Sequence, residues 1–390
     1  MLDKILEGLT AFPHRSPTTQ AEKKAAEYLQ ERLKELGLPA AGEPFTAATT
    51  FSWIYFILYF GFVVAIGVHY FFPLAGLLIA IIFTVLFVGE QLTYFSPLSR
   101  LVPRGKSQNV LARLEPESAE RRLILVAHYD TSKTALAFAP GAAKYLRPIF
   151  LASLVMIVTT LFGLGFHFVS AHVRGSALDY MLVLPALYFL YAAALMLERE
   201  VRGQPVQGAA DNASGVAVAV ELFRRIQAAG GLPGWSVWLL LTGAEEVGMA
   251  GMSAFLNVHG PELDKTRTIF LNFDNLGTGN LTYITGEGML KQLPADPELL
   301  RLAEQISKEE PFEDVRGRVY NILTLDTLVA RARGYRALSF MGLNENGVPW
   351  PWHWHNDVLD NVDRELIQLA AEFAWTLIQR LAQTPQDIRK

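Results

Sequence analysis

The chain has 390 residues, carries a net charge of −4 at neutral pH and contains no cysteine. This small negative charge argues against a nucleic-acid partner. The lack of cysteine excludes disulfides and leaves only His, Asp and Glu as ligands for a zinc site. Hydrophobic residues make up 51% of the chain, which is high for a soluble enzyme, and they are concentrated in a few segments. The length allows two domains or one large α/β domain with insertions.

The first 50 residues predict a polar segment with one amphipathic helix. The opening MLDKILEGLTAFPHRSPTT lacks the basic start, apolar core and small-residue cleavage site of a cleavable signal peptide. Thr19 is placed to cap the helix, Glu22 to complete a capping box, and Gly37 to end it. The apolar stripe of this helix consists of Ala25, Tyr28, Leu29, Leu33 and Leu36.

Long apolar runs follow in two pairs. Residues 45–89 contain no Asp, Glu, Lys or Arg, and this run is too long for one membrane span. About 20 apolar residues cross the hydrocarbon layer, whereas four buried core helices of this length would overfill a domain. We therefore predict two transmembrane hairpins, at 51–95 and 148–198. The four spans lie near 51–72 and 74–95, and within 148–173 and 180–197.

The charges beside these spans predict how the protein lies in the bilayer. Because each pair forms a hairpin, all the polar parts of the chain fall on one side of the membrane. Arg174 lies on the opposite side. The basic flanks on the polar side are Arg100, Arg104, Lys106, Lys144, Arg147, Arg199 and Arg202. This bias predicts an integral membrane protein whose polar domain and both termini face the cytoplasm.

The polar remainder, residues 1–50, 96–147 and 199–390, predicts one interrupted domain. Strands alternate with helices and are almost continuously apolar, which favours an α/β fold with a mostly parallel central sheet flanked by helices. The predicted strands are 109–114, 123–128, 235–243, 268–274 and 337–343. The predicted helices after the first one are 213–229, 249–258, 295–309 and 363–383.

Two strand ends carry candidate metal ligands. His128 and Asp130 stand two residues apart at the end of LILVAHYD, and in an extended segment both side chains point the same way. Asp130 could then orient the His128 imidazole behind a metal, although a buried, hydrogen-bonded histidine fits the same pattern. Asp274 ends TIFLNFD and could either bind a metal or begin a turn.

Further acidic residues stand at the start of a helix and after a strand. Asp211 in GAADNASG could cap the following helix, or its two oxygens could bridge two metals. Glu245 and Glu246 follow an apolar strand, where adjacent carboxylates are costly unless something neutralises them. One could bind a metal while the other reaches a bound water, and a solvated acidic loop is the alternative.

A loop rich in Trp and Pro holds two histidines, His353 and His355, before the last helix. The candidates at strand ends are His128, Glu245, Glu246 and Asp274. In open α/β sheets, ligands bind at the carboxyl ends of the strands. The sequence therefore predicts a site at this edge of the sheet, formed by carboxylates and imidazoles that suit a pair of zinc ions.

The ordered motifs HYDT, GAADNASGVA, AEEVGMAGMSAF, LNFDNLG and HWHNDVLDNVD closely resemble peptidase family 28, the zinc aminopeptidases. This resemblance implies a zinc-aminopeptidase-like fold, a peptide substrate and two Zn²⁺ or other divalent ions. It implies that His128 and Asp274 bind one ion, that Glu246 and His353 bind the other, and that Asp211 bridges both. Glu245 is the implied general base, and Asp130 the residue that orients His128. His353 is preferred to His355 because it keeps the family's four-residue spacing to Asp357.

The expected function is that of a membrane-anchored di-zinc aminopeptidase. Alternatives are a carboxypeptidase or an aminoacyl cyclotransferase on the same fold, and a catalytically silent membrane receptor or scaffold. Two features depart from the family. The membrane hairpins are unusual for it, and Leu325, Asp326 and Thr327 stand where many relatives carry Ser-Asp-His. The second departure predicts an altered substrate pocket.

Overall fold

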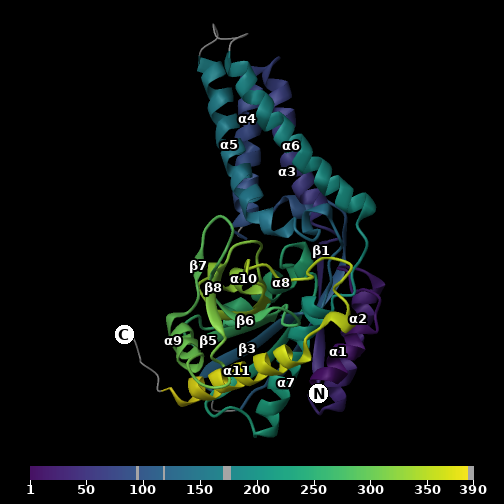
Figure 1. Cartoon of the computed structure of the whole chain (residues 1–390), viewed down its shortest axis with the longest axis vertical. Coiled ribbons are helices and arrows are strands. Elements are labelled where there is room, and N and C mark those ends of the chain that lie inside the picture. The colour runs from purple at the N-terminus through teal and green to yellow at the C-terminus, as the bar shows by residue number, and fades with distance from the viewer. Residues whose placement is uncertain (94–95, 117–118, 170–176, 385–390) are drawn as a thin grey trace. The chain divides into compact units, whose positions relative to one another are not determined.

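The computed structural model of the chain describes residues 1–93, 96–116, 119–169 and 177–384 (Figure 1). Backbone contacts divide the protein into two compact units, which we call the α/β unit and the helical unit. The α/β unit comprises Met1–Ala47, Gly105–Lys133 and Pro205–Lys390. The helical unit comprises Ala48–Arg104 and Thr134–Gln204, so it consists of two insertions into the other unit's sequence.

Among the described residues, the α/β unit contains a nine-stranded sheet. Its order is β1-β2-β4-β3-β5-β9-β6-β7, with β8 beside β6. The central strands β4, β3, β5 and β9 are parallel, whereas β2 and β6 run antiparallel to their central neighbours. The predicted α/β fold with a mostly parallel central sheet is therefore confirmed. The strands are β1 Ala40–Ala48, β2 Arg104–Leu114, β3 Arg121–His128, β4 Trp235–Thr242, β5 Thr268–Asp274, β6 Asn280–Glu287, β7 Leu293–Pro294, β8 Arg316–Tyr320 and β9 Arg336–Leu343.

Helices cover both faces of this sheet. Successive side chains of a strand point to opposite faces, so both faces carry apolar side chains that pack against helices. On β3, Leu123 and Leu125 face one apolar cluster, while Ile124 and Val126 face another. The first cluster packs against α1 Leu2–Thr10, α2 Gln20–Glu35, α7 Gly215–Ala228, α9 Pro297–Ile306 and α11 Arg364–Gln383. The second packs against α8 Ala250–His259 and α10 Asp326–Ala332. Central strands buried on both faces explain the continuous apolar runs in the sequence.

The predicted strands and helices of this unit correspond to β2, β3, β4, β5, β9, α2, α7, α8, α9 and α11. Several elements had no prediction: α1, α10, β1, β6, β7 and β8. Several of them are short, and most residues of β1 and β8 are exposed or half-buried. β6 is mostly buried, but its sequence NLTYITGE mixes polar with apolar residues, so no long apolar run forms. The helix α10 has only seven residues, about two turns, which is too short to show a helical period in the sequence.

The described residues of the helical unit form four long helices, α3 Ser52–His69, α4 Pro73–Gln91, α5 Leu146–Val169 and α6 Ala177–Arg202. Each is long and apolar enough to cross a membrane by length and composition. Inside the bundle Phe62 stacks on Phe189, with ring centroids 4.6 Å apart. The predicted hairpin link at Arg174 and the end of the second predicted span at 94–95 lie outside the described residues.

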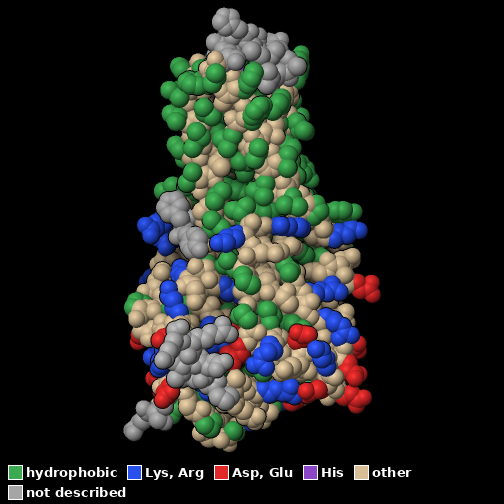
Figure 2. Space-filling view, turned by 90° about the vertical axis from the view of Figure 1, so that its left-hand side faces the viewer, with side chains coloured by type: hydrophobic (Ala, Val, Ile, Leu, Met, Phe, Trp, Pro, Cys, Tyr) green, Lys and Arg blue, Asp and Glu red, His purple; other side chains and the backbone are tan. Residues whose placement is uncertain are grey.

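Most apolar side chains of these helices point outward. Only 17% of the apolar window of α4 is buried within the protein, and 44% of that of α3. Figure 2 shows hydrophobic side chains covering this unit. Exposed examples are Leu78, Ile82, Val85, Val155, Val158, Phe162, Leu184 and Leu187. A surface this apolar is unusual for a water-exposed domain and indicates an apolar partner or solvent.

Candidate metal centre

The five predicted ligands come from separate segments that end at one edge of the sheet. His128 is the last residue of β3, and Asp274 is the last residue of the neighbouring β5. Glu246 lies in a short helical turn after β4. Asp211 lies in an irregular turn before α7, and His353 lies in the loop between β9 and α11. Because β3, β4 and β5 are parallel, their carboxyl ends bring His128, Glu246 and Asp274 to one edge of the sheet.

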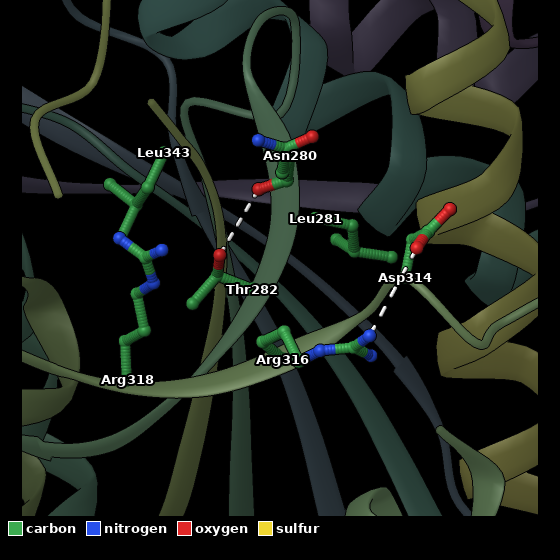
Figure 3. A pocket seen from close by; sticks show the side chains of 7 residues that line it. All are labelled: Asn280, Leu281, Thr282, Asp314, Arg316, Arg318 and Leu343. Carbon is green, nitrogen blue, oxygen red and sulfur yellow. Dashed lines mark hydrogen bonds and ion pairs between the residues drawn. The ribbon is translucent and has the colours of Figure 1, made fainter. Parts of the chain in front are cut away.

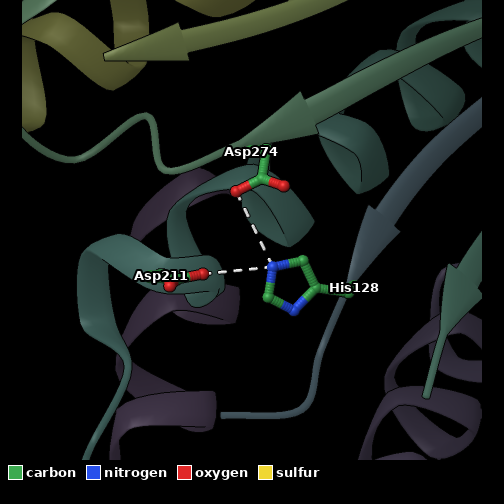
Figure 4. A group of neighbouring side chains, drawn as sticks. All are labelled: His128, Asp211 and Asp274. Carbon is green, nitrogen blue, oxygen red and sulfur yellow. Dashed lines mark ion pairs between the residues drawn. The ribbon is translucent and has the colours of Figure 1, made fainter. Parts of the chain in front are cut away.

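The first cluster, which we call the strand-end group, consists of His128, Asp211 and Asp274. His128 Nε2 lies 3.1 Å from Asp211 Oδ1 and 3.7 Å from Asp274 Oδ1 (Figure 4). All three side chains are buried. The three donor atoms lie close enough together to hold one metal ion.

The second cluster, which we call the loop group, consists of Asp211, Glu246 and His353. His353 Nε2 lies 3.1 Å from Asp211 Oδ2 and 3.0 Å from Glu246 Oε2. These side chains are also buried, and their donor atoms could hold one ion. Asp211 therefore faces a different imidazole with each of its two oxygens.

The residues of both groups fit zinc. Buried carboxylates are costly without a compensating charge, and Glu246 Oε1 is buried with no hydrogen-bond partner among the described residues. Burial acts to lower the pKa of His353, but Glu246 and Asp211 outweigh it and raise that pKa to about 9. Each imidazole thus lies in an excess of negative charge, which a dication would balance. Imidazole and carboxylate donors are ligands that zinc accepts.

Asp130 stands beside His128, as the proposed orienting role requires, and it also contacts a second part of the centre. His128 Nδ1 lies 3.3 Å from the backbone oxygen of Asp130 and 3.6 Å from its carboxylate. The carboxylate also accepts hydrogen bonds from the backbone N–H groups of Glu245 and Glu246, at 3.0 and 3.1 Å. Asp130 therefore fixes the turn that carries the paired glutamates, in addition to standing beside His128.

Glu245 belongs to neither group of donors. Its side chain keeps partial exposure, whereas Glu246 beside it is buried. Burial raises the pKa of Glu245 well above its usual range, and Asp326 and Glu246 act in the same direction against His128. The residue before it, Ala244, has a left-handed φ of 50°. This conformation is costly for a non-glycine residue and is often found at functional sites.

Three residues that sequence reasoning gave no role in the site support its backbone. Asp357 accepts hydrogen bonds from the N–H groups of Ala210 and Asp211, at 2.6 and 3.2 Å. The Asn212 side chain donates to Phe273 O and accepts from Asn275 N, at 2.9 and 3.1 Å. This amide therefore links the Asp211 turn to the residues on both sides of Asp274. Asp357 had a signal in the sequence, its fixed spacing from His353, but Asn212 had only its place after Asp211.

The third supporting residue is Glu22, which the capping box only partly explains. Thr19 Oγ1 accepts from Glu22 N as predicted, but the Glu22 carboxylate accepts from Thr18 N instead of Thr19 N. Its other oxygen accepts from Ser107 Oγ and from Ala244 N, at 2.7 and 3.0 Å. Burial and Asp130 raise the pKa of Glu22 to about 8. A partner 222 positions away explains why no local pattern revealed this contact.

The remaining residues of interest lie around the two groups. His355 is exposed and belongs to neither group. Asp326 begins α10 and accepts a hydrogen bond from Thr242 Oγ1 at 2.5 Å, at the end of β4. Thr327 Oγ1 lies 2.5 Å from Ser339 Oγ. These residues therefore face neighbouring side chains of the sheet from α10.

A separate hollow beside β6 and β8 has a different character (Figure 3). Thr282 Oγ1 donates to Asn280 O at 3.1 Å, and Arg316 lies 4.0 Å from Asp314. The lining consists of Asn280, Leu281, Thr282, Asp314, Arg316, Arg318 and Leu343. This lining includes no residue of the strand-end group or the loop group. We therefore place the chemistry at these two groups and not at the hollow.

Comparison with protein families places part of the chain. Residues 193–378 match the model of Peptidase family M28. That stretch belongs to peptidase family M28. The M28 stretch contains Asp211, Glu245, Glu246, Asp274 and His353, but not His128. Comparison with curated proteins found no match.

Solved structures share the M28 zinc-peptidase fold at low sequence identity. LapB from Legionella pneumophila aligns with a TM-score of 0.57 at 10% identity, over 98% of this chain and 72% of that one. A glutaminyl cyclase from Tannerella forsythia gives 0.57 at 15% identity, over 97% and 96%. BSAP, a zinc aminopeptidase from Bacillus subtilis, gives 0.56 at 12% identity, over 97% and 94%. At these identities the likeness establishes the fold.

Proposed function

We propose that this M28 protein is a membrane-anchored dinuclear zinc aminopeptidase. The observation that supports two ions is the position of Asp211, whose oxygens lie 3.1 Å from His128 Nε2 and 3.1 Å from His353 Nε2. A centre with a single ion would give no reason for one buried carboxylate to face two imidazoles. The family and the donor types support zinc.

The positions of the residues support a role for each of them. His128 and Asp274 would hold one ion, Glu246 and His353 the other, and Asp211 both. When bound, two close zinc ions lower the pKa of water and polarise the scissile carbonyl. Glu245 takes a proton from the attacking water and delivers it to the leaving amine nitrogen as the C–N bond breaks. Its partial exposure suits a group that meets both the water and the substrate.

A second candidate is aminoacyl cyclisation, because a glutaminyl cyclase aligns over 97% of this chain. The names of other aligned structures, a zinc aminopeptidase and a Zn-dependent exopeptidase, support peptide hydrolysis. A cyclase needs only one zinc. The sharing of Asp211 between two donor groups therefore favours the aminopeptidase.

The test is elemental analysis of the detergent-purified chain together with a panel of aminoacyl-chromophore, N-blocked and N-terminal glutaminyl peptides. We expect about two zinc ions per chain and release of unblocked N-terminal residues. Glu245→Gln should lower kcat by about 10²-fold or more while zinc content stays unchanged, because it removes the base and no ligand. One zinc with a cyclised product would instead support the cyclase. Full activity of Glu245→Gln would remove the base from the mechanism.

We propose that the helical unit anchors the protein in a bilayer. The 18 residues of α3 span about 27 Å at 1.5 Å per residue, close to the hydrocarbon thickness of about 30 Å. The basic flanks favour a cytoplasmic α/β unit. Since the chain has no cysteine, single cysteines at Phe71 and Thr266, both exposed, can test this. An impermeant maleimide should label only Phe71→Cys in intact cells and both sites after permeabilisation. Labelling of Thr266→Cys alone in intact cells would reverse the orientation.

A further inference from the structure

Arg15 is a fully buried cation in the segment between α1 and α2. Its guanidinium donates to four backbone carbonyl groups. Nε donates to Tyr129 O at 2.6 Å, and Nη2 donates to Gly208 O at 2.8 Å. Nη1 donates to Leu9 O at 3.1 Å and to Gln207 O at 2.7 Å. A planar guanidinium has five N–H donors in a fixed geometry, so it fixes the relative positions of the groups that it contacts.

The segments that Arg15 joins both carry groups of the metal centre. Tyr129 stands between His128 and Asp130, and Gly208 precedes Asp211 by three residues. The second insertion, Thr134–Gln204, separates these two segments in the sequence. Arg15 therefore connects the segment that leads into this insertion with the segment that leaves it.

Two further hydrogen bonds join Arg15 to Thr131, on the Tyr129 side. Arg15 N donates to Thr131 Oγ1 at 2.9 Å, and Thr131 N donates to Arg15 O at 3.3 Å. On the other side, Gly208 has a φ of +67°, and a Cβ there would lie 2.3 Å from Thr131 Cγ2 and 2.4 Å from Asp211 O. The two segments and Arg15 are thus packed too closely for any larger residue at position 208.

The acids of the centre compensate for the cost of burying this cation. Burial lowers the pKa of Arg15 to about 10, and Asp357, Asp130 and Asp211 oppose that effect. The guanidinium therefore stays charged at neutral pH and lies in the field of the carboxylates. Its hydrogen bonds to carbonyl groups leave those carboxylates available to other partners.

We propose that Arg15 is a positioning residue that sets the separation of His128 and Asp211, the two members of the strand-end group on either side of the second insertion. This proposal rests on the metal centre described above. Loss of Arg15 would leave every candidate ligand in place but would remove the side-chain hydrogen bonds that join Tyr129 to Gln207 and Gly208. The neighbouring backbone contact of Val206 N with Ser132 O, at 3.2 Å, would remain, so we expect the Gln207–Asp211 segment to loosen without detaching.

The experiment compares full-length Arg15→Met and Arg15→Lys with the wild type, all purified in detergent. Hydrogen–deuterium exchange is measured on chelator-treated protein for peptides covering 129–133 and 206–213. Zinc affinity, kcat and KM are measured on zinc-loaded protein. Arg225→Met is the control, because Arg225 forms ion pairs with Glu221 and Glu372, both at 2.8 Å, and within the described part of the chain it has no ion pair with a residue of the centre.

For Arg15→Met we expect about tenfold faster exchange in both peptides, about 10- to 100-fold weaker zinc binding, and a larger fall in kcat than rise in KM. Arg15→Lys keeps the charge but not the planar fork, so it should show the same changes at a smaller size. Arg225→Met should leave both peptides and zinc binding as in the wild type, whatever its melting temperature.

Exchange that stays at the wild-type rate in both peptides of Arg15→Met would overturn the proposal. If Arg15→Met does not fold, wild-type exchange and zinc binding in Arg15→Lys would overturn it equally, since charge alone would then suffice. A wild type that binds no zinc would refute the proposed function, while the exchange comparison would still decide the role of Arg15.

Discussion

The strand-end group and the loop group share Asp211 but are held in different ways. His128 and Asp274 are the last residues of β3 and β5, which are hydrogen-bonded neighbours in the sheet. The hydrogen bonds between these two strands therefore fix the separation of His128 and Asp274. Glu246 and His353 come from turns, and the backbone adopts left-handed φ values of 50° at Ala244 and 53° at His353. Each such residue costs about 1–3 kcal/mol. The comparison shows that sheet pairing positions His128 and Asp274, whereas the turn that carries Glu246 depends on side-chain contacts from distant parts of the sequence.

In these contacts, carboxylates accept hydrogen bonds from backbone N–H groups. Asp130 holds the N–H groups of Glu245 and Glu246, and Glu22 holds that of Ala244. Charge-assisted hydrogen bonds of this kind are stronger than neutral ones. We therefore expect substitutions at these carboxylates to affect the loop group more than the strand-end group.

The largest expected effect comes from the shared ligand. Asp211→Asn should lower kcat/KM by more than about 10³-fold and reduce bound zinc in both groups, because a neutral amide cannot offer an anionic oxygen to each ion. Elemental analysis and steady-state kinetics measure this, with the exposed Asp360→Asn as the matched control. Two zinc ions retained by Asp211→Asn would mean that the groups do not share a ligand.

A smaller effect should separate the two groups. His353→Ala should lose the ion of the loop group and keep that of the strand-end group, so that zinc content falls from about two to about one and kcat drops by about 10²-fold or more. The exposed His355→Ala should keep both ions and stay within about threefold of wild-type activity. The opposite pattern in this pair would assign the ligand to His355.

The smallest expected effect tests the support of the loop group. Asp130→Asn should weaken zinc binding at the loop group by about 10- to 100-fold, because the amide nitrogen cannot accept the N–H group that one carboxylate oxygen now holds. Stepwise metal titration of the chelator-treated protein measures both ions separately. Equal weakening of the two groups would indicate that Asp130 acts mainly through His128.

The sequence predicted the candidate residues better than it predicted their supports. His128 and Asp274 end strands whose apolar runs are long, so their meeting at one edge followed from the parallel sheet. Glu246, Asp211 and His353 stand in motifs whose order resembles the M28 family. The structure brings all five into two groups. The assignment of Glu245 as base remains a prediction.

Two of the supports, Glu22 and Arg15, had no comparable signal for their contacts with the centre. Glu22 contacts Ala244 across 222 positions, and Arg15 contacts Gly208 across 193. Their partners are backbone N–H and carbonyl groups, which every residue carries, so no residue type in the partner segment marks the contact. The short strands β7 and β8 were missed for a related reason, since each has too few residues to show a period.

The chain segments on either side of each insertion are hydrogen-bonded neighbours. β1 and β2 are sheet neighbours on either side of the first insertion, and Lys133 pairs with Pro205 across the second. Loop length adds only slowly to the entropic cost of closing a chain whose ends already meet. In evolution, either insertion could lengthen, shorten or disappear while the register of β3, β4 and β5 stayed the same.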